Sequence, residues 1–254
     1  MTIKSADLHI GTSGWSYKHW VEIFYPKDIK PDKYLEYYLT RFDCVELNSS
    51  FYNLPRETTV TGWMNRTPET FRFCPKLSRL ITHQMQLKNI ELALYKFFDV
   101  FEGMKNRLGP VLIQLPPGLS YDKPLICNFL NLLKEHYNQY RFAVEVRNKS
   151  WINDSFFGLL SQFGISFVIA DSGNRYPYFE TVTTDFLYLR FHGREQLYAS
   201  DYSENDLKSY AEKITVWLNE GKEVWVFFNN DYYCYAVKNA DRLKKIIYQF
   251  YNPL

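Results

Sequence analysis

Charged side chains recur at the ends of short apolar runs along this chain, where they could do chemistry together. Glu46 lies in the run CVELN and Glu145 in FAVEV, Asp171 directly follows SFVIA, and His192 directly follows FLYLRF. Carboxylates and imidazoles are the usual general acids and bases of enzymes. We therefore predict that Glu46, Glu145, Asp171 and His192 are catalytic residues.

A second group of side chains at the same places could bind a substrate. Lysine and arginine fit phosphate or carboxylate oxygens, and the arginine fork can do so bidentately. Amide side chains could orient hydroxyl groups, and aromatic rings could carry a sugar. The predicted substrate-binding residues are Asn48, Lys76, Gln114, Arg147, Arg190, Asn230, Trp15, Tyr52 and Trp151.

Strand alternation joins several of these residues into pairs. Residues two apart on a strand share a face, which joins Glu145 to Arg147 and Arg190 to His192. Charges are costly to bury unless they are paired or bound to a ligand. The cluster is therefore either a ligand site or a set of structural ion pairs, such as Glu145 with Arg190. Its repeated place at one end of the runs favours the ligand site.

Eight runs rich in β-branched and aromatic residues alternate with helical patterns, as is typical of βα units and a parallel sheet. The predicted strands are Leu8–Gly11, Cys44–Asn48, Phe71–Pro75, Pro110–Leu115, Phe142–Val146, Ser166–Ala170, Phe186–Phe191 and Glu223–Phe228. The predicted helices are Asp32–Thr40, Asn89–Met104, Leu125–Tyr137, Ser155–Phe163, Ser203–Asn219 and Ala240–Tyr251. The segment from Ser203 to Asp206 predicts a capping box at the start of one helix.

Eight strands in 254 residues predict an α/β chain folded as one (β/α)8 TIM barrel over residues 1–254. No linker-like stretch divides the chain. In such a barrel the catalytic groups lie at the C-terminal ends of the strands, where the predicted site residues fall. An open doubly wound sheet is the alternative, but no GxGxxG follows the first run.

The composition narrows the function classes. A net charge of +2 neither requires nor excludes an anionic partner such as a nucleic acid. No signal-like segment or long apolar stretch occurs, which predicts a cytoplasmic protein without a membrane partner. Because no Walker motif or dinucleotide fingerprint is present, we expect no nucleotide cofactor.

Six runs in order carry a family resemblance: GTSGW, VELNSSFYNLP, VLIQLPP, VEVRNKSW, YLRFHG and FFNND. Together they resemble the YecE-like family, domain of unknown function 72, over nearly the whole chain. The resemblance implies a TIM barrel of uncharacterised function and supplies no catalytic residue or cofactor. The family pattern VEFRHxSW has Phe and His where this chain has Val146 and Asn148. Thr82-His83 also resembles a family motif, which implies that His83 lies near the mouth of the barrel.

Four functions remain open on the sequence. The first is an enzyme that acts by acid–base chemistry on an anionic substrate, either a phosphorylated sugar or a nucleic-acid fragment. The second is a hydrolase or isomerase that depends on Mg²⁺ or Mn²⁺, for which Glu46, Glu145, Asp171 and His192 would supply ligands. The third is a metal-free glycoside hydrolase that uses Glu46 and Glu145. The fourth is a non-catalytic nucleic-acid-binding module.

Overall fold

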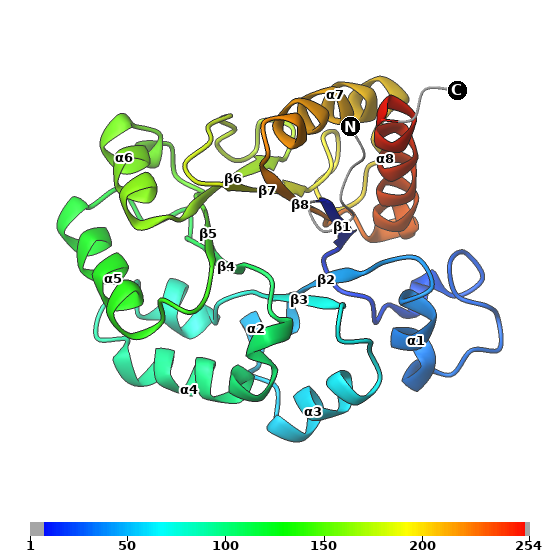
Figure 1. The fold of residues 1–254 in the computed structure, drawn as a ribbon, viewed down its shortest axis with the longest axis horizontal. Helices are drawn as coiled ribbons and strands as arrows, with labels where there is room; N and C mark the ends of the chain where they lie inside the picture. Colours follow the sequence, from blue (N-terminus) through cyan, green and yellow to red (C-terminus); the bar gives the residue numbers. More distant parts are fainter. Residues whose placement is uncertain (1–7, 252–254) are drawn as a thin grey trace. The chain divides into compact units, whose positions relative to one another are not determined.

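The computed structural model describes residues 8–251 (Figure 1). The strands are β1 Leu8–Thr12, β2 Cys44–Leu47, β3 Arg72–Pro75, β4 Val111–Gln114, β5 Phe142–Glu145, β6 Ser166–Asp171, β7 Phe186–Phe191 and β8 Glu223–Phe228. The α-helices are α1 Tyr34–Tyr38, α2 Ser49–Tyr52, α3 Glu57–Asn65, α4 Glu91–Phe101, α5 Lys123–His136, α6 Asp154–Phe163, α7 Glu204–Asn219 and α8 Tyr235–Tyr251. All eight predicted strands are thus confirmed to within one or two residues at each end.

The described residues form two compact units. Unit 1 comprises the described parts of Met1–Val45, Ile169–Tyr178 and Asp185–Leu254. Unit 2 comprises Glu46–Val168 and Phe179–Thr184.

Unit 1 is built on three neighbouring parallel strands, β1, β8 and β7. Val226 of β8 is aligned with Ile10 of β1 on one side and with Leu189 of β7 on the other. The helices α7 and α8 lie side by side and pack on these strands (Figure 1). The predicted capping box at the start of α7 is confirmed, because Ser203 and Asp206 exchange side-chain-to-backbone hydrogen bonds.

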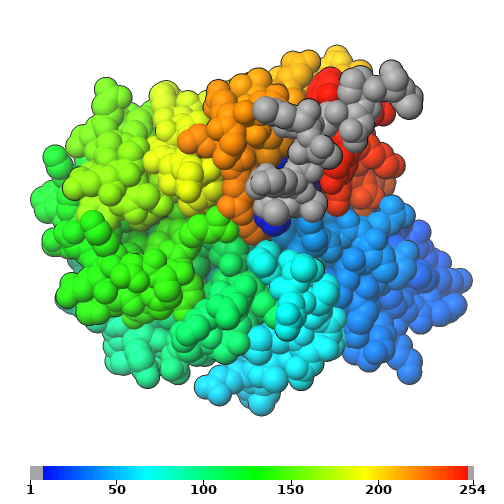
Figure 2. All heavy atoms as spheres, in the orientation of Figure 1, coloured from blue at the N-terminus to red at the C-terminus, as the bar shows by residue number. Residues whose placement is uncertain are grey.

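Unit 2 contains the parallel pair β4 and β5, in which Ile113 is aligned with Val144. The first residues of β6 extend this pair, with Ser166 aligned with Ala143. The amphipathic helices α5 and α6 pack against each other, and their atoms form one continuous surface in Figure 2. The side chains that directly follow β3, β4 and β5 therefore project from the ends of ordered strands.

The predicted (β/α)8 TIM barrel is wrong, because the eight strands do not close into one sheet. Six strands are hydrogen-bonded in the order β1-β8-β7-β6-β5-β4, and β2 pairs with β3 in a separate two-stranded sheet. Between β3 and β4 the described residues have only isolated bridges, one of which aligns Lys76 with Leu112.

A tyrosine hydroxyl explains why β1 and β2 form no regular ladder where they approach each other in unit 1. The buried Tyr38 hydroxyl accepts a hydrogen bond from the Thr12 backbone N–H at 3.0 Å and donates one to the Cys44 carbonyl at 3.0 Å. It therefore occupies the place that a direct backbone hydrogen bond would take. The two backbones are close even so, since a Cβ on Gly11 would lie 2.5 Å from the Cys44 carbonyl oxygen.

Across residues 8–251, no helix combines the length and the apolar character that crossing a membrane would require.

Candidate functional site

The predicted site residues divide between the two units. Unit 2 holds Glu46, Asn48, Tyr52, Lys76, Gln114, Glu145, Arg147 and Trp151, and unit 1 holds Trp15, Asp171, Arg190, His192 and Asn230. Each unit brings some of its residues together at the C-terminal ends of its strands and leaves others apart.

In unit 2, two cations converge on one neutral oxygen. The side-chain carbonyl Oε1 of Gln114 accepts hydrogen bonds from Lys76 Nζ at 2.8 Å and from Arg147 Nη2 at 3.3 Å. Arg147 also forms an ion pair with the fully buried Glu145 carboxylate. Both cationic residues are more than nine-tenths buried, whereas Gln114 is only half-buried. The predicted residues at the ends of β3, β4 and β5 thus form one connected group.

The Lys76 ammonium also lies over an aromatic ring, 3.9 Å from the centroid of Phe51. The same ring meets the His83 imidazole edge to face, at a centroid distance of 5.0 Å. His83 is half-buried on a short π-helical turn, Leu80–Gln84, and its Nδ1 lies 2.8 Å from Thr82 Oγ1. His83 therefore lies beside this group, with the Phe51 ring between it and Lys76.

The pKa of His83 reflects the electrostatic surroundings in this region. Burial, together with the positive charges of Lys76, Arg79 and Arg147, lowers the pKa of its imidazole from 6.5 to about 4. A lowered histidine pKa means that nearby cations and desolvation oppose a further positive charge. His83 is consequently a neutral imidazole at pH 7, in a region of positive potential.

Two predicted aromatic residues of unit 2 have very different surroundings. Trp151 is fully buried, packs on Phe156 at 4.9 Å and donates its indole N–H to the Leu119 carbonyl at 2.7 Å. Tyr52, at the end of α2, is 69% exposed. The structure thus gives Trp151 a packing role and leaves the Tyr52 ring open to solvent.

The remaining residues of unit 2 lie near the ends of β2 and β5. Glu46 is fully buried in β2, and Asn48 is half-buried directly after that strand. Asn148, which replaces the histidine of the family pattern, accepts a hydrogen bond from the Ser150 backbone N–H and so caps a 3₁₀ turn. Its side-chain amide also donates to the Pro117 carbonyl at 2.9 Å. An asparagine at this position therefore orders the loop after β5.

In unit 1, the Asp171 carboxylate at the end of β6 receives three donors. Arg194 Nε and the Tyr210 hydroxyl each lie 2.7 Å from Oδ2, and the Gly173 backbone N–H lies 3.2 Å from Oδ1. Burial and the Asp171 charge raise the pKa of Tyr210 far above its usual value, so that this phenol remains a donor. Arg194 also pairs with Asp206 at the start of α7. Asp171 thus ties the β6 end to the loop after β7 and to α7.

His192, at the end of β7, is fully buried and has a defined tautomer. The Asn229 side-chain amide donates to its Nδ1 at 3.1 Å, which places the proton of the neutral ring on Nε2. The rings of Tyr176 and Tyr198 face it edge-on, at centroid distances of 6.3 and 5.8 Å. His192 therefore lies beside an amide side chain and two tyrosine rings.

Three further predicted residues of unit 1 are placed as follows. Arg190 is fully buried in β7. Asn230 is also fully buried, and its amide donates to the Ser200 carbonyl at 2.9 Å and to Asn239 Oδ1 at 2.8 Å. Trp15 is half-buried after β1, where its carbonyl accepts a hydrogen bond from a tyrosine hydroxyl. Asn230 in this position fastens the loops after β7 and β8 to α8.

Sequence reasoning gave no role to His83, Arg194 or Tyr210. Thr82-His83 did stand out as a motif, but only the π-helical turn brings its imidazole to the Phe51 ring. Arg194 lies two residues beyond His192, where a loop cation could have been considered as the partner of Asp171. No local pattern in the sequence predicts the hydrogen bond of Tyr210, because this residue occupies an apolar position of an amphipathic helix.

The metal hypothesis was tested on the donor groups. Within the described residues, no three His, Cys, Asp or Glu side chains are grouped closely enough to hold a metal ion. Of the four proposed ligands, Glu145 is paired with Arg147 and Asp171 with Arg194.

Comparison with known proteins gives a family and a fold. The model of a family described as protein of unknown function DUF72 matches residues 9–252. The protein UPF0759 YecE of Escherichia coli (strain K12) is 30% identical over 171 residues, which are 65% of this chain and 59% of that protein. The chain thus matches less than two thirds of that relative's length. UPF0759 protein YunF of Bacillus subtilis (strain 168) is 25% identical over 94% of both chains.

Two solved structures have the same arrangement of elements. The DUF72 family protein TM1631 of Thermotoga maritima MSB8 is 32% identical, with a TM-score of 0.86 over 95% of this chain and 99% of its own. The DUF72 family protein EF0366 of Enterococcus faecalis V583 has a TM-score of 0.82 at 23% identity, over 95% of both chains, and shows the fold alone.

Proposed function

This chain belongs to the DUF72 family, a family of unknown function, and we propose that it is an enzyme that binds an anionic small molecule in unit 2 and acts on it by acid–base chemistry. The substrate class is a phosphorylated sugar or a nucleic-acid fragment. The phosphate would lie against Lys76 and Arg147, and His83 would move the proton.

The observation that carries this proposal is the convergence of two cations on the Gln114 carbonyl oxygen. Holding Lys76 and Arg147 side by side costs electrostatic energy unless negative charge is nearby. The Glu145 carboxylate supplies negative charge to Arg147, with which it forms an ion pair. An anionic oxygen beside the amide would gain two charge-assisted hydrogen bonds from donors that are already oriented.

The lowered pKa of His83 supports the same conclusion. The three cations that depress it are the groups that an anion would meet in this part of unit 2. Burial is the largest cause of the lowered pKa, and the positive charges add to it, as they would in a site that attracts anions.

The chemistry follows from the response of His83 to binding. A bound phosphate would offset the charges of Lys76 and Arg147 but not the effect of burial, so the pKa of His83 would rise part of the way from about 4 towards its ordinary value of 6.5. The neutral imidazole could then accept a proton from the substrate and return it in a later step. Glu145 would act by holding the Arg147 guanidinium in place.

A thermal-shift and calorimetric screen tests the proposal. The probes are inorganic phosphate, glucose 6-phosphate, a short oligonucleotide and, as the uncharged control, glucose, all at matched ionic strength. A ligand at a hundredfold excess over its Kd stabilises by about 2.7 kcal/mol, which is roughly 5–10 °C for a domain of this size. We expect stabilisation by at least one phosphate-bearing probe and none by glucose.

The matched variants are Lys76→Met and Lys96→Met, each of which removes one positive charge from unit 2. Lys96 is exposed on α4. Loss of a charge-assisted hydrogen bond at Lys76 should weaken phosphate binding by about 10-fold or more, whereas Lys96→Met should leave it unchanged. Equal affinities of the two variants, or no binding of any phosphate compound, would contradict the proposal.

A further inference from the structure

Unit 1 contains a polar groove that the proposed function does not use. It has a volume of about 460 Å³ and runs between the loop after β7 and the first half of α8. Its lining includes Glu195, Gln196, Asp201, Ser203, Tyr235 and Arg242. The volume lies in the range of small-molecule sites.

The floor of this groove is held by several hydrogen bonds, so its shape is set before any ligand arrives. Arg242 donates to the Tyr202 carbonyl at 3.2 Å and to Glu204 at 3.0 Å, and it lies 3.5 Å from the Asp201 carboxylate. Asn239 accepts from the Tyr202 backbone N–H. A groove that is ordered in this way binds without a large cost in conformational entropy.

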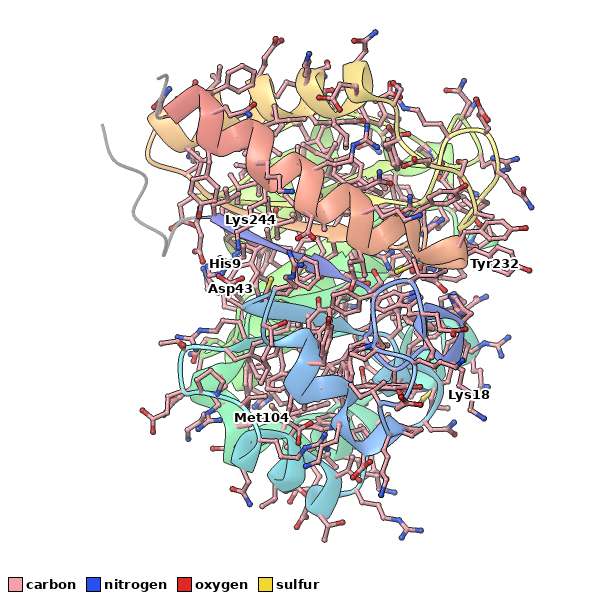
Figure 3. All side chains as sticks on the ribbon, turned by 90° about the vertical axis from the view of Figure 1, so that its right-hand side faces the viewer. His9, Lys18, Asp43, Met104, Tyr232 and Lys244 are labelled. Atoms are coloured by element: carbon pink, nitrogen blue, oxygen red, sulfur yellow. The ribbon has the colours of Figure 1, made fainter. Side chains whose placement is uncertain are left out.

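A row of tyrosines continues from the groove wall into solvent. Tyr235 lies 5.8 Å from Tyr233, and Tyr233 lies 4.6 Å from Tyr232, measured between ring centroids. Tyr233 is 58% exposed and Tyr232 is 54% exposed. In Figure 3, Tyr232 and Lys18 lie at one end of unit 1, while His9 and Lys244 lie at the other. The row is therefore at the end where β1 and β8 finish.

The backbone under this row is strained. Tyr233 and Cys234 both adopt left-handed conformations, with φ of 55° and 61°, although neither is glycine. Each such residue costs of order 1–3 kcal/mol, and strain of this kind is concentrated at functional sites. The strained pair directs two adjacent tyrosine rings outward beside the groove.

The charges of the residues that line the groove indicate which class of ligand it binds. Glu195 and Asp201 contribute negative charge, and the one lining cation, Arg242, already faces Asp201 and Glu204. The lining therefore offers an anion no unengaged cation, and the nearby Lys238 ammonium lies over the Tyr235 ring, 5.5 Å from its centroid. Carboxylate, amide and hydroxyl groups can instead pair with neighbouring hydroxyls of a neutral ring, and tyrosine faces can pack against the C–H faces of that ring. We propose that this groove binds a neutral carbohydrate, with Glu195 and Gln196 contacting its hydroxyls and the Tyr235–Tyr233 row packing against its rings.

Saturation-transfer NMR and calorimetry on the full chain test this inference. The probes are neutral oligosaccharides of glucose and of N-acetylglucosamine at up to ~10 mM, with spermidine as the cationic alternative and inorganic phosphate as the anionic one. The variants are Glu195→Gln and Tyr233→Ala. The control is Tyr95→Ala, which removes an equally exposed ring (59%) from α4 of unit 2.

We expect at least one oligosaccharide to bind, with affinity lowered about 10-fold or more by Tyr233→Ala and by Glu195→Gln and unchanged by Tyr95→Ala. Melting temperatures close to wild type would show that the variants fold. Binding of spermidine in place of every sugar, binding of no sugar, or equal binding by all three variants would each overturn the proposal.

Discussion

The charged groups at the strand ends of the two units are balanced in different ways. In unit 1 the carboxylate of Asp171 receives an arginine, a phenol and a backbone N–H. In unit 2 two cations converge on the neutral oxygen of Gln114, and the nearby His83 titrates at about 4. The first arrangement surrounds a carboxylate with donors, whereas the second brings two cations to one neutral oxygen. A buried charged residue alone therefore does not identify a binding site. The groups that surround the charge have to be compared as well.

The largest expected effect concerns the ion pair of unit 2. In Arg147→Met, the fully buried Glu145 carboxylate loses its cation. Removing one partner of a buried ion pair costs about 3–5 kcal/mol, and urea unfolding should show a loss of this size in the free energy of unfolding. The double variant Glu145→Gln/Arg147→Met should regain most of it. A loss below about 1 kcal/mol in the single variant would mean that Glu145 is not held by this pair.

Unit 1 should depend instead on tyrosine hydroxyls. Tyr38→Phe removes both the acceptor for the Thr12 N–H and the donor to the Cys44 carbonyl. Each unsatisfied buried backbone group costs about 1–3 kcal/mol, so the free energy of unfolding should fall by about 2–4 kcal/mol. Tyr95→Phe, at an exposed position of α4, is the control and should leave the free energy of unfolding unchanged. An unaltered stability of Tyr38→Phe would show that β1 and β2 can pair directly when the hydroxyl is absent.

A smaller effect is expected for Tyr210→Phe. The variant removes one of three donors to Asp171, while Arg194 and the Gly173 N–H remain. The expected loss is about 1–2 kcal/mol, measured by the same unfolding experiment. A loss as large as that of Arg147→Met would contradict the comparison, because the Asp171 carboxylate of unit 1 would then depend on one donor as strongly as Glu145 of unit 2 depends on Arg147.

The pH dependence of stability should report the potential in unit 2. His83 has a folded pKa of about 4, below its unfolded value of 6.5. As the pH falls from 6.5 towards 4, the unfolded chain takes up this proton first, so the folded state loses stability across that window. Above pH 6.5 the residue has no effect. Unfolding of wild type and His83→Gln should therefore diverge only below pH 6.5, and parallel curves would contradict the lowered pKa.

The strands and most helices could be predicted because their signals are local. Runs of β-branched and aromatic residues mark every strand, and the capping box of Ser203 and Asp206 marks the start of α7. The helix α3, Glu57–Asn65, was missed because it buries only Val60 and so has little apolar periodicity. Closure of the barrel was predicted wrongly because neither β1 with β2 nor β3 with β4 forms a regular ladder, and no local pattern reveals the Tyr38 contact or the isolated bridges found there.

The candidate site could be predicted in part for the same reason. The residues at the ends of β3, β4 and β5 project from adjacent backbone, and Lys76, Gln114 and Arg147 do meet. The role of His83 depends on a π-helical turn and on its distance from three cations, which are properties of the folded chain. The three donors to Asp171 come from separate segments, so the sequence could not reveal that this carboxylate is already satisfied.

The most direct test of an anion site in unit 2 is the pKa of His83 measured by NMR, with and without inorganic phosphate. Without phosphate the imidazole should titrate near 4, and saturating phosphate should raise its pKa towards 6.5. In Lys76→Met the starting pKa should already be higher, and phosphate should change it less. A His83 pKa that phosphate leaves unchanged, in a protein that binds phosphate, would show that the anion lies elsewhere and would contradict the proposed site.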